Sequence, residues 1–150
     1  VTAAVRGDEV TRNVSDYCAP VVVREALVEQ QRGIGRERSC VCEGRDIGTV
    51  VFPGAELKFF MTASVRERAL RRQKDFAALG VRKGLEELES EIEERDRKDS
   101  TRANSPLLKA DDAEVIDTTE MTLQEQVNHI VGRAEQLIRS PDFAGEPGRN

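Results

Sequence analysis

The chain has 150 residues and a formal net charge of −5; 38% of its residues are hydrophobic, 34% are charged and 4% are aromatic. This length and balance are typical of one charged globular domain and exclude a disordered chain. The negative net charge and the absence of tryptophan argue against a nucleic acid partner, and no run approaches the roughly 18 apolar residues of a membrane span.

The amino-terminal part of the chain contains one clear helix signal. Residues 1–20 have a mixed pattern that predicts no particular element. Residues 21–32 gather their apolar side chains on one side of a charged segment, which predicts a helix that ends at Gly33. The β-prone run at residues 39–43 stops at Gly44 and is predicted to be a strand.

Two more strands are predicted further along the chain. Residues 57–62 and residues 113–118 are short and largely apolar, as expected of parallel strands that are buried on both faces. With residues 39–43 they make three strands that alternate with helices. This alternation predicts an α/β fold with a parallel sheet.

Helices are predicted between and after these strands. The helices at residues 64–79 and from residue 122 onward each open on a capping box, and residues 85–102 form the helix between them. The last helix has an apolar stripe that is predicted to pack into the core: Leu123, Val127, Ile130, Ala134 and Leu137. Residues 141–150 are rich in proline and glycine and are predicted to be a disordered tail, which leaves residues 1–140 as one domain.

The cysteines and the single histidine are predicted to be structural. The chain has three cysteines, Cys18, Cys40 and Cys42. An odd number of cysteines without paired spacing favours a reducing compartment such as the cytoplasm. Cys40 and Cys42 could suggest a metal site, but they lie in an apolar run without two further ligands. Core thiols are the preferred interpretation. His129 lies beside the apolar stripe and is expected to have a structural role.

The segment EGRDIGT, residues 43–49, directly follows the first predicted strand. Ligands of open α/β sheets bind beyond the carboxyl ends of the strands, so Arg45 and Asp46 are predicted to lie at the opening of a binding site. The flanking glycines would let backbone approach a ligand closely. The alternative is a surface turn in which Arg45 and Asp46 form a local ion pair.

The helix at residues 85–102 has a side-chain stripe that changes from apolar to charged half-way along. Its members, in order, are Leu85, Leu88, Ile92, Arg95, Asp99 and Arg102. Burying such charges is costly unless they are paired or meet a charged ligand, so the stripe predicts a binding face. Arg97 and Lys98 are expected to point mainly to solvent. The alternative is that the helix extends past the core and that the whole charged half is solvated.

Arginines are dense in residues 65–72. Four of them occur within about two helical turns: Arg66, Arg68, Arg71 and Arg72. Guanidinium groups stay charged and match phosphate oxygens in a bidentate manner, so this cluster could clamp phosphates. The alternative is an ordinary charged helix face, in which Glu67 and Asp75 partly offset the arginines.

Together these segments resemble the bacterial cytidylate kinases, a family of P-loop nucleoside monophosphate kinases. The resemblance covers about residues 5–137 and is densest in residues 43–53, EGRDIGTVVFP, with further matches at residues 23–27, 57–58 and 94–96. It implies a nucleotide-binding transferase of pyrimidine metabolism that moves the γ-phosphoryl group of ATP to CMP or dCMP, with Mg²⁺ as cofactor. A cytoplasmic monomer that binds small nucleotides is expected.

The resemblance also implies roles for individual residues. Those expected around the cytosine are Ser15, Arg24, Asp46 and Arg102. The acceptor phosphate is expected at Arg45 and Arg95, and the sugar hydroxyls are expected at Asp99. The lid arginines expected to close over the ATP phosphates are Arg68, Arg71 and Arg72. The residues expected to act in catalysis are Arg45, Arg71 and Arg95.

The chemistry of cytosine agrees with these roles. Cytosine presents an amino donor and two acceptors, so a site that recognises it needs a carboxylate beside arginines. Asp46 with Arg24 and Arg102 meets that need. Uracil reverses donor and acceptor at two positions, which would leave a buried group unpaired. Phosphoryl transfer needs positioning and charge neutralisation, and arginines supply both without a protein nucleophile.

One expected motif is missing from these 150 residues: the Gly-x-x-x-x-Gly-Lys-Ser/Thr loop that holds the ATP phosphates. The family's strand order is 2-3-1-4-5, and the three predicted strands correspond to strands 3, 4 and 5. We therefore expect a partial P-loop-type sheet with flanking helices, without the first strand and the P-loop, in a chain that is inactive alone. The magnesium ligands are expected in the absent part. The alternatives are a non-catalytic nucleotide-binding remnant and a helical interaction module, although a helical module does not explain residues 44–53.

Overall fold

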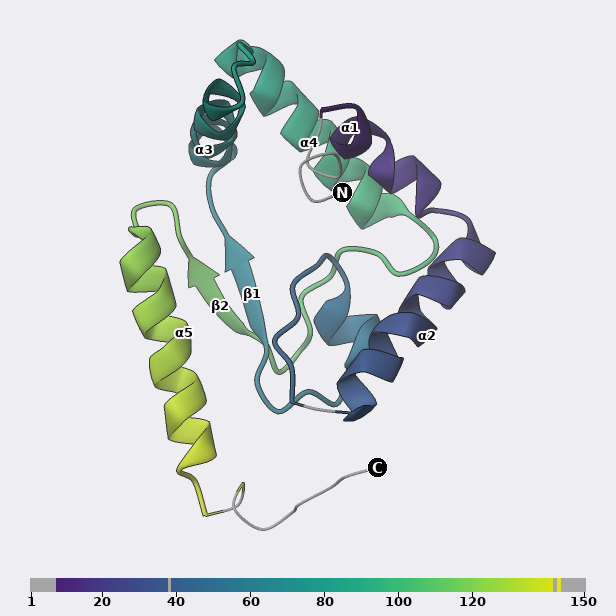
Figure 1. The fold of residues 1–150 in the computed structure, drawn as a ribbon, viewed down its shortest axis with the longest axis vertical. Coiled ribbons are helices and arrows are strands. Elements are labelled where there is room, and N and C mark those ends of the chain that lie inside the picture. The colour runs from purple at the N-terminus through teal and green to yellow at the C-terminus, as the bar shows by residue number, and fades with distance from the viewer. Residues whose placement is uncertain (1–7, 38, 142, 144–150) are drawn as a thin grey trace.

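The computed structural model describes residues 8–37, 39–141 and 143 (Figure 1). The elements in chain order are α1 (Asp8–Tyr17), α2 (Val21–Glu37), the π-helix η2 (Ile47–Val51), β1 (Phe59–Thr62), α3 (Val65–Ala78), α4 (Leu85–Thr101), β2 (Glu114–Asp117) and α5 (Leu123–Ile138). The two strands lie at the centre of the ribbon, with α3 and α4 at one end, α5 along one side and α2 on the other.

The sheet pairs β1 with β2 in parallel, and Phe59 lies opposite Glu114. Both strands fall inside the segments predicted from the sequence, so the α/β class with a parallel sheet is confirmed. The third predicted strand is wrong: residues 39–43 are irregular, and Val41 is fully exposed. A strand exists only through hydrogen bonds to a neighbour, and none joins these residues to another described segment.

Helix α2 continues past Gly33, where the sequence predicted its end, and runs to Glu37. Glycine inside a helix costs only about 1 kcal/mol relative to alanine, so packing can override it. At Gly35 the packing needs the glycine, because a Cβ atom there would lie 2.6 Å from the ring of Phe52. The helix therefore gains a close contact with the segment that follows η2.

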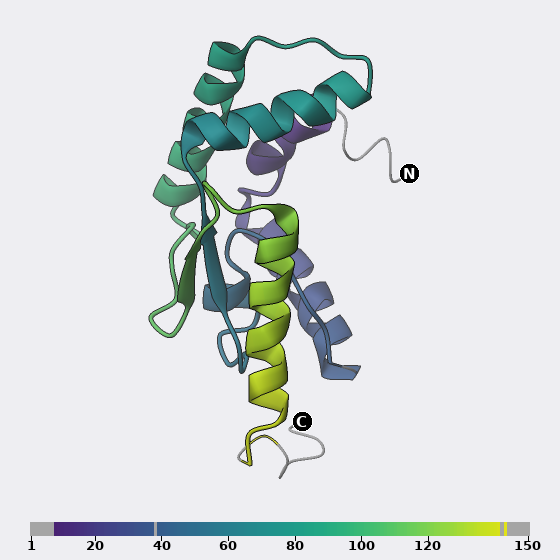
Figure 2. The ribbon, with the colours of Figure 1, turned by 90° about the vertical axis from the view of Figure 1, so that its left-hand side faces the viewer.

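Helices α3 and α4 cross and pack against each other at one end of the molecule (Figure 2), and they contain the main apolar core. The buried members are Ala69, Phe76 and Leu88, and Leu85 and Ile92 pack against them. As predicted, α3 begins at the cap Ser64, whose Oγ accepts a hydrogen bond from the backbone of Glu67. The chain leaves α3 through Gly80, whose positive φ of 76° suits a residue without Cβ. The apolar half of the α4 stripe therefore lies where the sequence placed it.

Helix α5 opens on the predicted capping box of Thr122 and Glu125, but its apolar stripe is not in a core. No residue of α5 is buried, and Leu123 and Val127 are 75% and 44% exposed. A sheet of two strands is too narrow to cover the apolar side of this helix. The contact of α5 with the sheet includes His129, whose ring meets that of Phe59 edge-on at 6.3 Å.

The cysteines are free, and the prediction of core thiols is wrong for two of them. Cys40 and Cys42 are exposed and Cys18 is half-buried, because the first two lie in the unpaired segment at residues 39–43. No helix in the described part of the chain is long and apolar enough to cross a membrane. The predicted disordered tail, residues 141–150, falls almost wholly outside the described residues.

Candidate functional site

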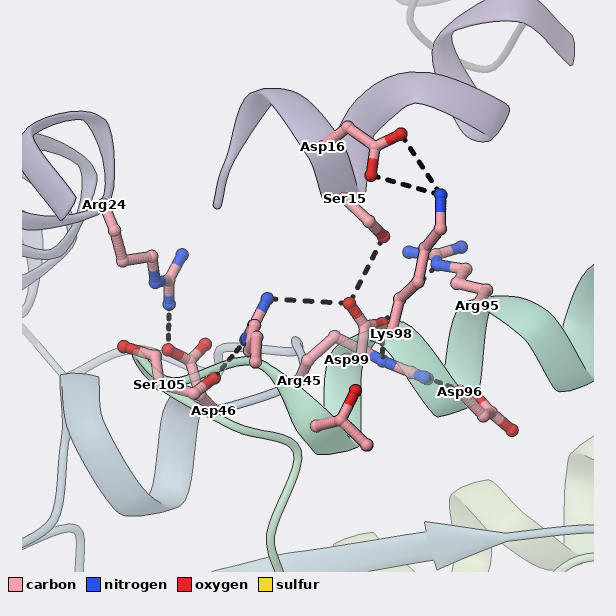
Figure 3. A network of polar contacts seen from close by, with 12 residues as sticks. Ser15, Asp16, Arg24, Arg45, Asp46, Arg95, Asp96, Lys98, Asp99 and Ser105 are labelled. Carbon is pink, nitrogen blue, oxygen red and sulfur yellow. Dashed lines mark hydrogen bonds and ion pairs between the residues drawn. The ribbon is translucent and has the colours of Figure 1, made fainter. Parts of the chain in front are cut away.

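The candidate site is built around the carboxylate of Asp99 in α4, whose exposure is only 2% (Figure 3). Arg45 donates from Nε to Oδ2 at 2.7 Å, and Ser15 of α1 donates from Oγ to Oδ1 at 3.2 Å. The guanidinium groups of Arg95 and Arg102 lie 3.7 and 3.5 Å from the same carboxylate. Five side chains that the sequence placed near one nucleotide therefore meet at one point.

Asp46 and Arg24 form a second buried pair beside this cluster. Their side chains are 4% and 12% exposed, and Arg24 donates from Nη2 to Oδ2 of Asp46. The backbone oxygen of Asp46 accepts from the amide of Val51 at 3.3 Å, five residues on, and so begins η2. Arg45 and Asp46 therefore precede a π-helix, a rare element that is often found at functional sites.

Arg32 of α2 fixes the other end of η2, and the sequence analysis assigned it no role. Its Nη2 donates to the backbone oxygen of Val50 at 2.7 Å, and its Nε donates to that of Val51 at 3.0 Å. These carbonyls lie in the last turn of the helix, where they lack partners within it. Arg24 and Arg32 thus tie both ends of η2 to α2. No periodicity in the sequence signals a contact of this kind.

Asp96 is a further member of the cluster that the sequence analysis did not assign. Its Oδ1 accepts from Nη2 of Arg45, and its Oδ2 lies 2.6 Å from Nη1 of Arg68 in α3. Burial raises the pKa of the Asp96 carboxyl, but the hydrogen bonds from the two arginines outweigh burial and hold that pKa below its ordinary value. The available signal was its position three residues before Asp99 on the same helix face.

Several guanidinium nitrogens in this cluster are buried without a hydrogen-bond acceptor among the residues that the structure describes. They are Nε of Arg24, Nε of Arg68, Nε of Arg95 and Nη2 of Arg102. Burial, and then the positive charge of Arg45, lowers the pKa of the Arg95 guanidinium. Unsatisfied buried donors cost free energy. Those of Arg95 and Arg102 lie beside the Asp99 carboxylate, and those of Arg24 and Arg68 belong to the partners of Asp46 and Asp96. Buried donors of this kind are suited to an anionic or carbonyl-bearing ligand.

Two residues of α4 next to the cluster, Arg97 and Lys98, differ in the direction of their side chains. Arg97 donates to Glu94 at 2.8 Å on the exposed face, as the stripe predicted. Lys98 differs from its prediction, because its Nζ reaches Asp16 of α1 at 3.1 Å rather than pointing only to solvent. The sequence predicted no helix at residues 8–17, and α1 supplies this partner.

The three predicted lid arginines point to different places. Arg68 joins the cluster through Asp96. Arg71 links α3 to the end of β2, since its Nη2 and Nη1 donate to the backbone oxygen and Oγ1 of Thr118 at 2.6 and 3.1 Å. Arg72 lies over the ring of Phe76 at 4.5 Å. Arg68 therefore has a direct contact with the cluster around Asp96 and Asp99, and Arg71 is bound to Thr118 at the end of β2.

A cavity of about 210 Å³ opens between α1 and α4, and its lining includes Ser15, Asp99 and Arg102. A larger hollow of about 640 Å³ lies at the carboxyl end of β2, beside Thr119 and His129, away from the arginine cluster. The smaller cavity coincides with the buried charges, and its size suits part of a small ligand. The charged groups, rather than the larger volume, mark the candidate site.

Residues 1–136 match the sequence model of a family described as cytidylate kinase. The chain belongs to the cytidylate kinase family. A cytidylate kinase of Listeria welshimeri is 50% identical over 140 residues, which are 93% of this chain and 62% of that protein. A cytidylate kinase of Lactococcus lactis is 48% identical over 138 residues, which are 92% of this chain and 63% of that protein.

Similar proteins also include a fused one. A bifunctional pantoate ligase/cytidylate kinase of a Synechococcus species is 53% identical over 138 residues, which are 92% of this chain and 26% of that protein. This member of the cytidylate kinase family thus spans less than two thirds of the length of these relatives.

The residues of the site do not fit a magnesium ion. Among the described residues, no group of three or more His, Cys, Asp or Glu side chains could hold a metal. The carboxylates of Asp46, Asp96 and Asp99 are each paired with arginine, whereas Mg²⁺ prefers carboxylate oxygens that it can coordinate directly. The arginines of this candidate site suit an anionic ligand better than a metal ion.

Proposed function

We propose that this chain binds CMP or dCMP at the Asp99 cluster, and that the whole protein transfers the γ-phosphoryl group of ATP to that nucleotide. The observation that carries the proposal is the buried carboxylate of Asp99, which lies within 4 Å of three guanidinium groups, two of which also have unsatisfied nitrogens. Membership of the cytidylate kinase family and similarity to bacterial cytidylate kinases support the same conclusion.

The base is proposed to lie between α1 and η2. The Asp46 carboxylate would accept the amino group of cytosine, while Arg24 and Arg102 would donate to its ring nitrogen and carbonyl oxygen. Ser15 can donate or accept and lies at the cavity lining. A uracil ring would place a carbonyl oxygen against Asp46, which leaves two acceptors facing each other.

The phosphate is proposed to bind at Arg45 and Arg95, with Asp99 toward the sugar hydroxyls. Four guanidinium groups, of Arg45, Arg68, Arg95 and Arg102, face two carboxylates in this cluster. The cluster therefore has an excess of two positive charges, which complements the dianionic phosphate of CMP. Bidentate contacts would also orient the acceptor oxygen, and orientation is the main requirement of phosphoryl transfer.

Residues 1–140 would then form the acceptor-binding and lid part of a kinase domain. Arg68, Arg71 and Arg72 of α3 are proposed to meet the ATP phosphates, with Arg71 and Arg95 acting beside Arg45 in the transfer. The nucleotide donor is proposed to be ATP with Mg²⁺. The described residues offer no site for the ion, so the role assigned to them is limited to binding and orienting the nucleotides.

Isothermal titration of this chain with CMP and UMP tests the acceptor site. CMP should bind at least about 10-fold more tightly than UMP, because uracil leaves Asp46 without a donor. Arg95→Ala should weaken CMP binding by about 10-fold, whereas the matched Arg97→Ala variant should stay within about two-fold of the parent. Equal binding of the two nucleotides, or none, contradicts the proposal.

A coupled assay of ADP release from ATP and CMP tests transfer by the whole protein. Turnover of CMP and dCMP is expected there, and none is expected from these 150 residues alone, because the sequence lacks a Gly-x-x-x-x-Gly-Lys-Ser/Thr loop. Tight CMP binding without turnover by the whole protein would instead indicate a non-catalytic nucleotide-binding protein.

A further inference from the structure

One carboxylate, that of Asp96, joins arginines from two distant parts of the chain. Its Oδ1 accepts from Nη2 of Arg45, in the segment before η2. Its Oδ2 lies 2.6 Å from Nη1 of Arg68, in the first turn of α3. The Asp96 side chain is 28% exposed, so solvent screens these ion pairs only in part.

Arg45 is held from two directions. Its Nε donates to Asp99 at 2.7 Å, and its Nη2 donates to Asp96 one helical turn earlier on α4. A guanidinium group fixed in this way loses little conformational freedom when an anion binds to its remaining N–H groups. The two carboxylates thus orient Arg45 before any phosphate arrives.

Among the contacts described, the Arg68 side chain pairs with Asp96, and Arg68 is not a member of the apolar core. The apolar contacts of α3 with α4 come from Ala69 and Phe76, and Nε of Arg68 is buried without an acceptor among the described residues. Its ion pair with Asp96 therefore places a second guanidinium beside Arg45. In this way α3, the helix with the predicted lid arginines, is tied directly to the acceptor cluster.

We propose that Asp96 is a positioning residue, whose carboxylate orients Arg45 for the acceptor phosphate and couples the acceptor site to helix α3 through Arg68. The inference rests on the proposed function, since it takes Arg45 as a phosphate ligand. It assigns Asp96 no contact with the nucleotide. Asp96 acts through the two arginines that it holds.

The Asp96→Asn variant tests the orienting role, because it keeps the side-chain shape and removes the charge. CMP binding to this variant should weaken by about 10-fold, since an amide holds a guanidinium less firmly than a carboxylate does. Cytidine, which has no phosphate, should bind within about two-fold of its affinity for the parent. Glu94→Gln is the matched control, because Glu94 lies on the same helix and pairs only with the exposed Arg97 among the contacts described.

Two further variants separate positioning from a general structural effect. Asp96→Glu keeps the charge and should restore CMP binding to within about three-fold of the parent. In the absence of ATP, Arg68→Ala should weaken CMP binding to the parent by about three-fold. In the Asp96→Asn background the same substitution should have no effect on CMP binding, because Arg68 acts through Asp96. A lid arginine that touches only ATP would leave CMP binding unchanged in both backgrounds.

Hydrogen exchange of α3 tests the coupling without any nucleotide. Amides of residues 68–71 should exchange faster in Asp96→Asn than in the parent and in Glu94→Gln, because the variant loses the ion pair that ties this turn to α4. Unchanged exchange overturns the coupling, whether or not the chain binds CMP. Equal losses for CMP and cytidine overturn the orienting role, while failure of the parent to bind CMP counts against the proposed function alone.

Discussion

Asp99 shows how a single buried carboxylate can organise a site. A buried charge is costly unless it is paired and hydrogen-bonded, and Asp99 is 2% exposed. It receives hydrogen bonds from Arg45 and Ser15 and lies close to Arg95 and Arg102. Because more guanidinium groups than carboxylates gather here, the cluster keeps donors for a ligand after its internal pairs are made.

Arg102 is expected to act on the choice of base rather than on the phosphate. Its Nη2 is buried without an acceptor among the described residues, and its Nε is held by the backbone oxygen of Ser105. Arg102→Ala should therefore reduce the preference for CMP over UMP, from at least about 10-fold to within about three-fold. Parallel titrations of the parent and the variant with both nucleotides measure the ratio.

Arg97→Ala serves as the control for this measurement, because Arg97 pairs with Glu94 on the solvent side of the same helix. The ratio of CMP affinity to UMP affinity of this variant should match that of the parent. If Arg102→Ala lowers the affinity for CMP and for UMP by the same factor, Arg102 contacts the phosphate rather than the base.

The sequence predicted some residues of the cluster and missed others, depending on the kind of contact that each residue makes. Arg95, Asp99 and Arg102 were accessible because they continue an apolar stripe with helical spacing. Arg24 and Ser15 were reached only through a family resemblance, since nothing in their local sequence sets them apart. Arg32 and Asp96 were missed because their partners lie in other elements.

At the scale of elements, the predictions succeeded where local sequence decides the structure. Capping residues and apolar spacing located both ends of α3 and α4, and the start of α5, to within a residue or two. The strand at residues 39–43 failed because a strand depends on a partner that no local pattern reveals. The end of α2 failed because Phe52 packs against Gly35 and offsets the cost of glycine in a helix.

The attachment of α5 to the sheet depends on polar contacts around Glu114 of β2. Its Oε1 lies 2.7 Å from Nε2 of His129, and its Oε2 accepts from Nε of Arg133 at 2.8 Å. The hydrogen bonds from Arg133 and then from His129 hold the pKa of Glu114 below its ordinary value of 4.5. Since no residue of α5 is buried, these polar contacts contribute much to the orientation of the helix against the sheet.

The stability that Glu114 provides should depend on pH. Its pKa is depressed in the folded chain, so the contribution is present above its ordinary value of 4.5 and is lost as the pH falls through the folded value. The parent should have a higher melting temperature than Glu114→Gln at about pH 6, and the difference should close toward about pH 3. Thermal melts of both proteins across this range provide the measurement.

Glu135→Gln is the matched control for Glu114→Gln, because Glu135 pairs with Arg139 directly after α5 and, among the contacts described, with no second element. It should change the melting temperature less at every pH. A Glu114→Gln difference that persists unchanged at acid pH would show that the ion pairs are not its source.

At the scale of the whole molecule, α4 connects regions that otherwise share few contacts. Its first half packs against α3 through Leu85, Leu88 and Ile92. In its second half, the carboxylate of Asp99 accepts hydrogen bonds both from Ser15 of α1 and from Arg45. Figure 1 shows α4 running from the end occupied by α3 to the side occupied by α1. The apolar core and the candidate site are therefore both built on the same helix.

The stripe on α4 has a consequence for insertions and deletions. Each added residue turns the following part of a helix by about 100° and shifts it by about 1.5 Å. One alanine inserted between Glu93 and Glu94 would leave the apolar contacts with α3 in place and rotate Arg95, Asp99 and Arg102 away from residue 45. CMP binding should then fall by more than about 10-fold.

One alanine inserted after Gly80, in the connection before α4, is the matched control, because it leaves the rotational phase within α4 unchanged. This variant should bind CMP within about two-fold of the parent. Titration with CMP separates the two insertions. By the same reasoning, length differences among related sequences should fall in the connection at residues 79–84 and be absent between residues 88 and 99, where the helical phase joins the core to the site.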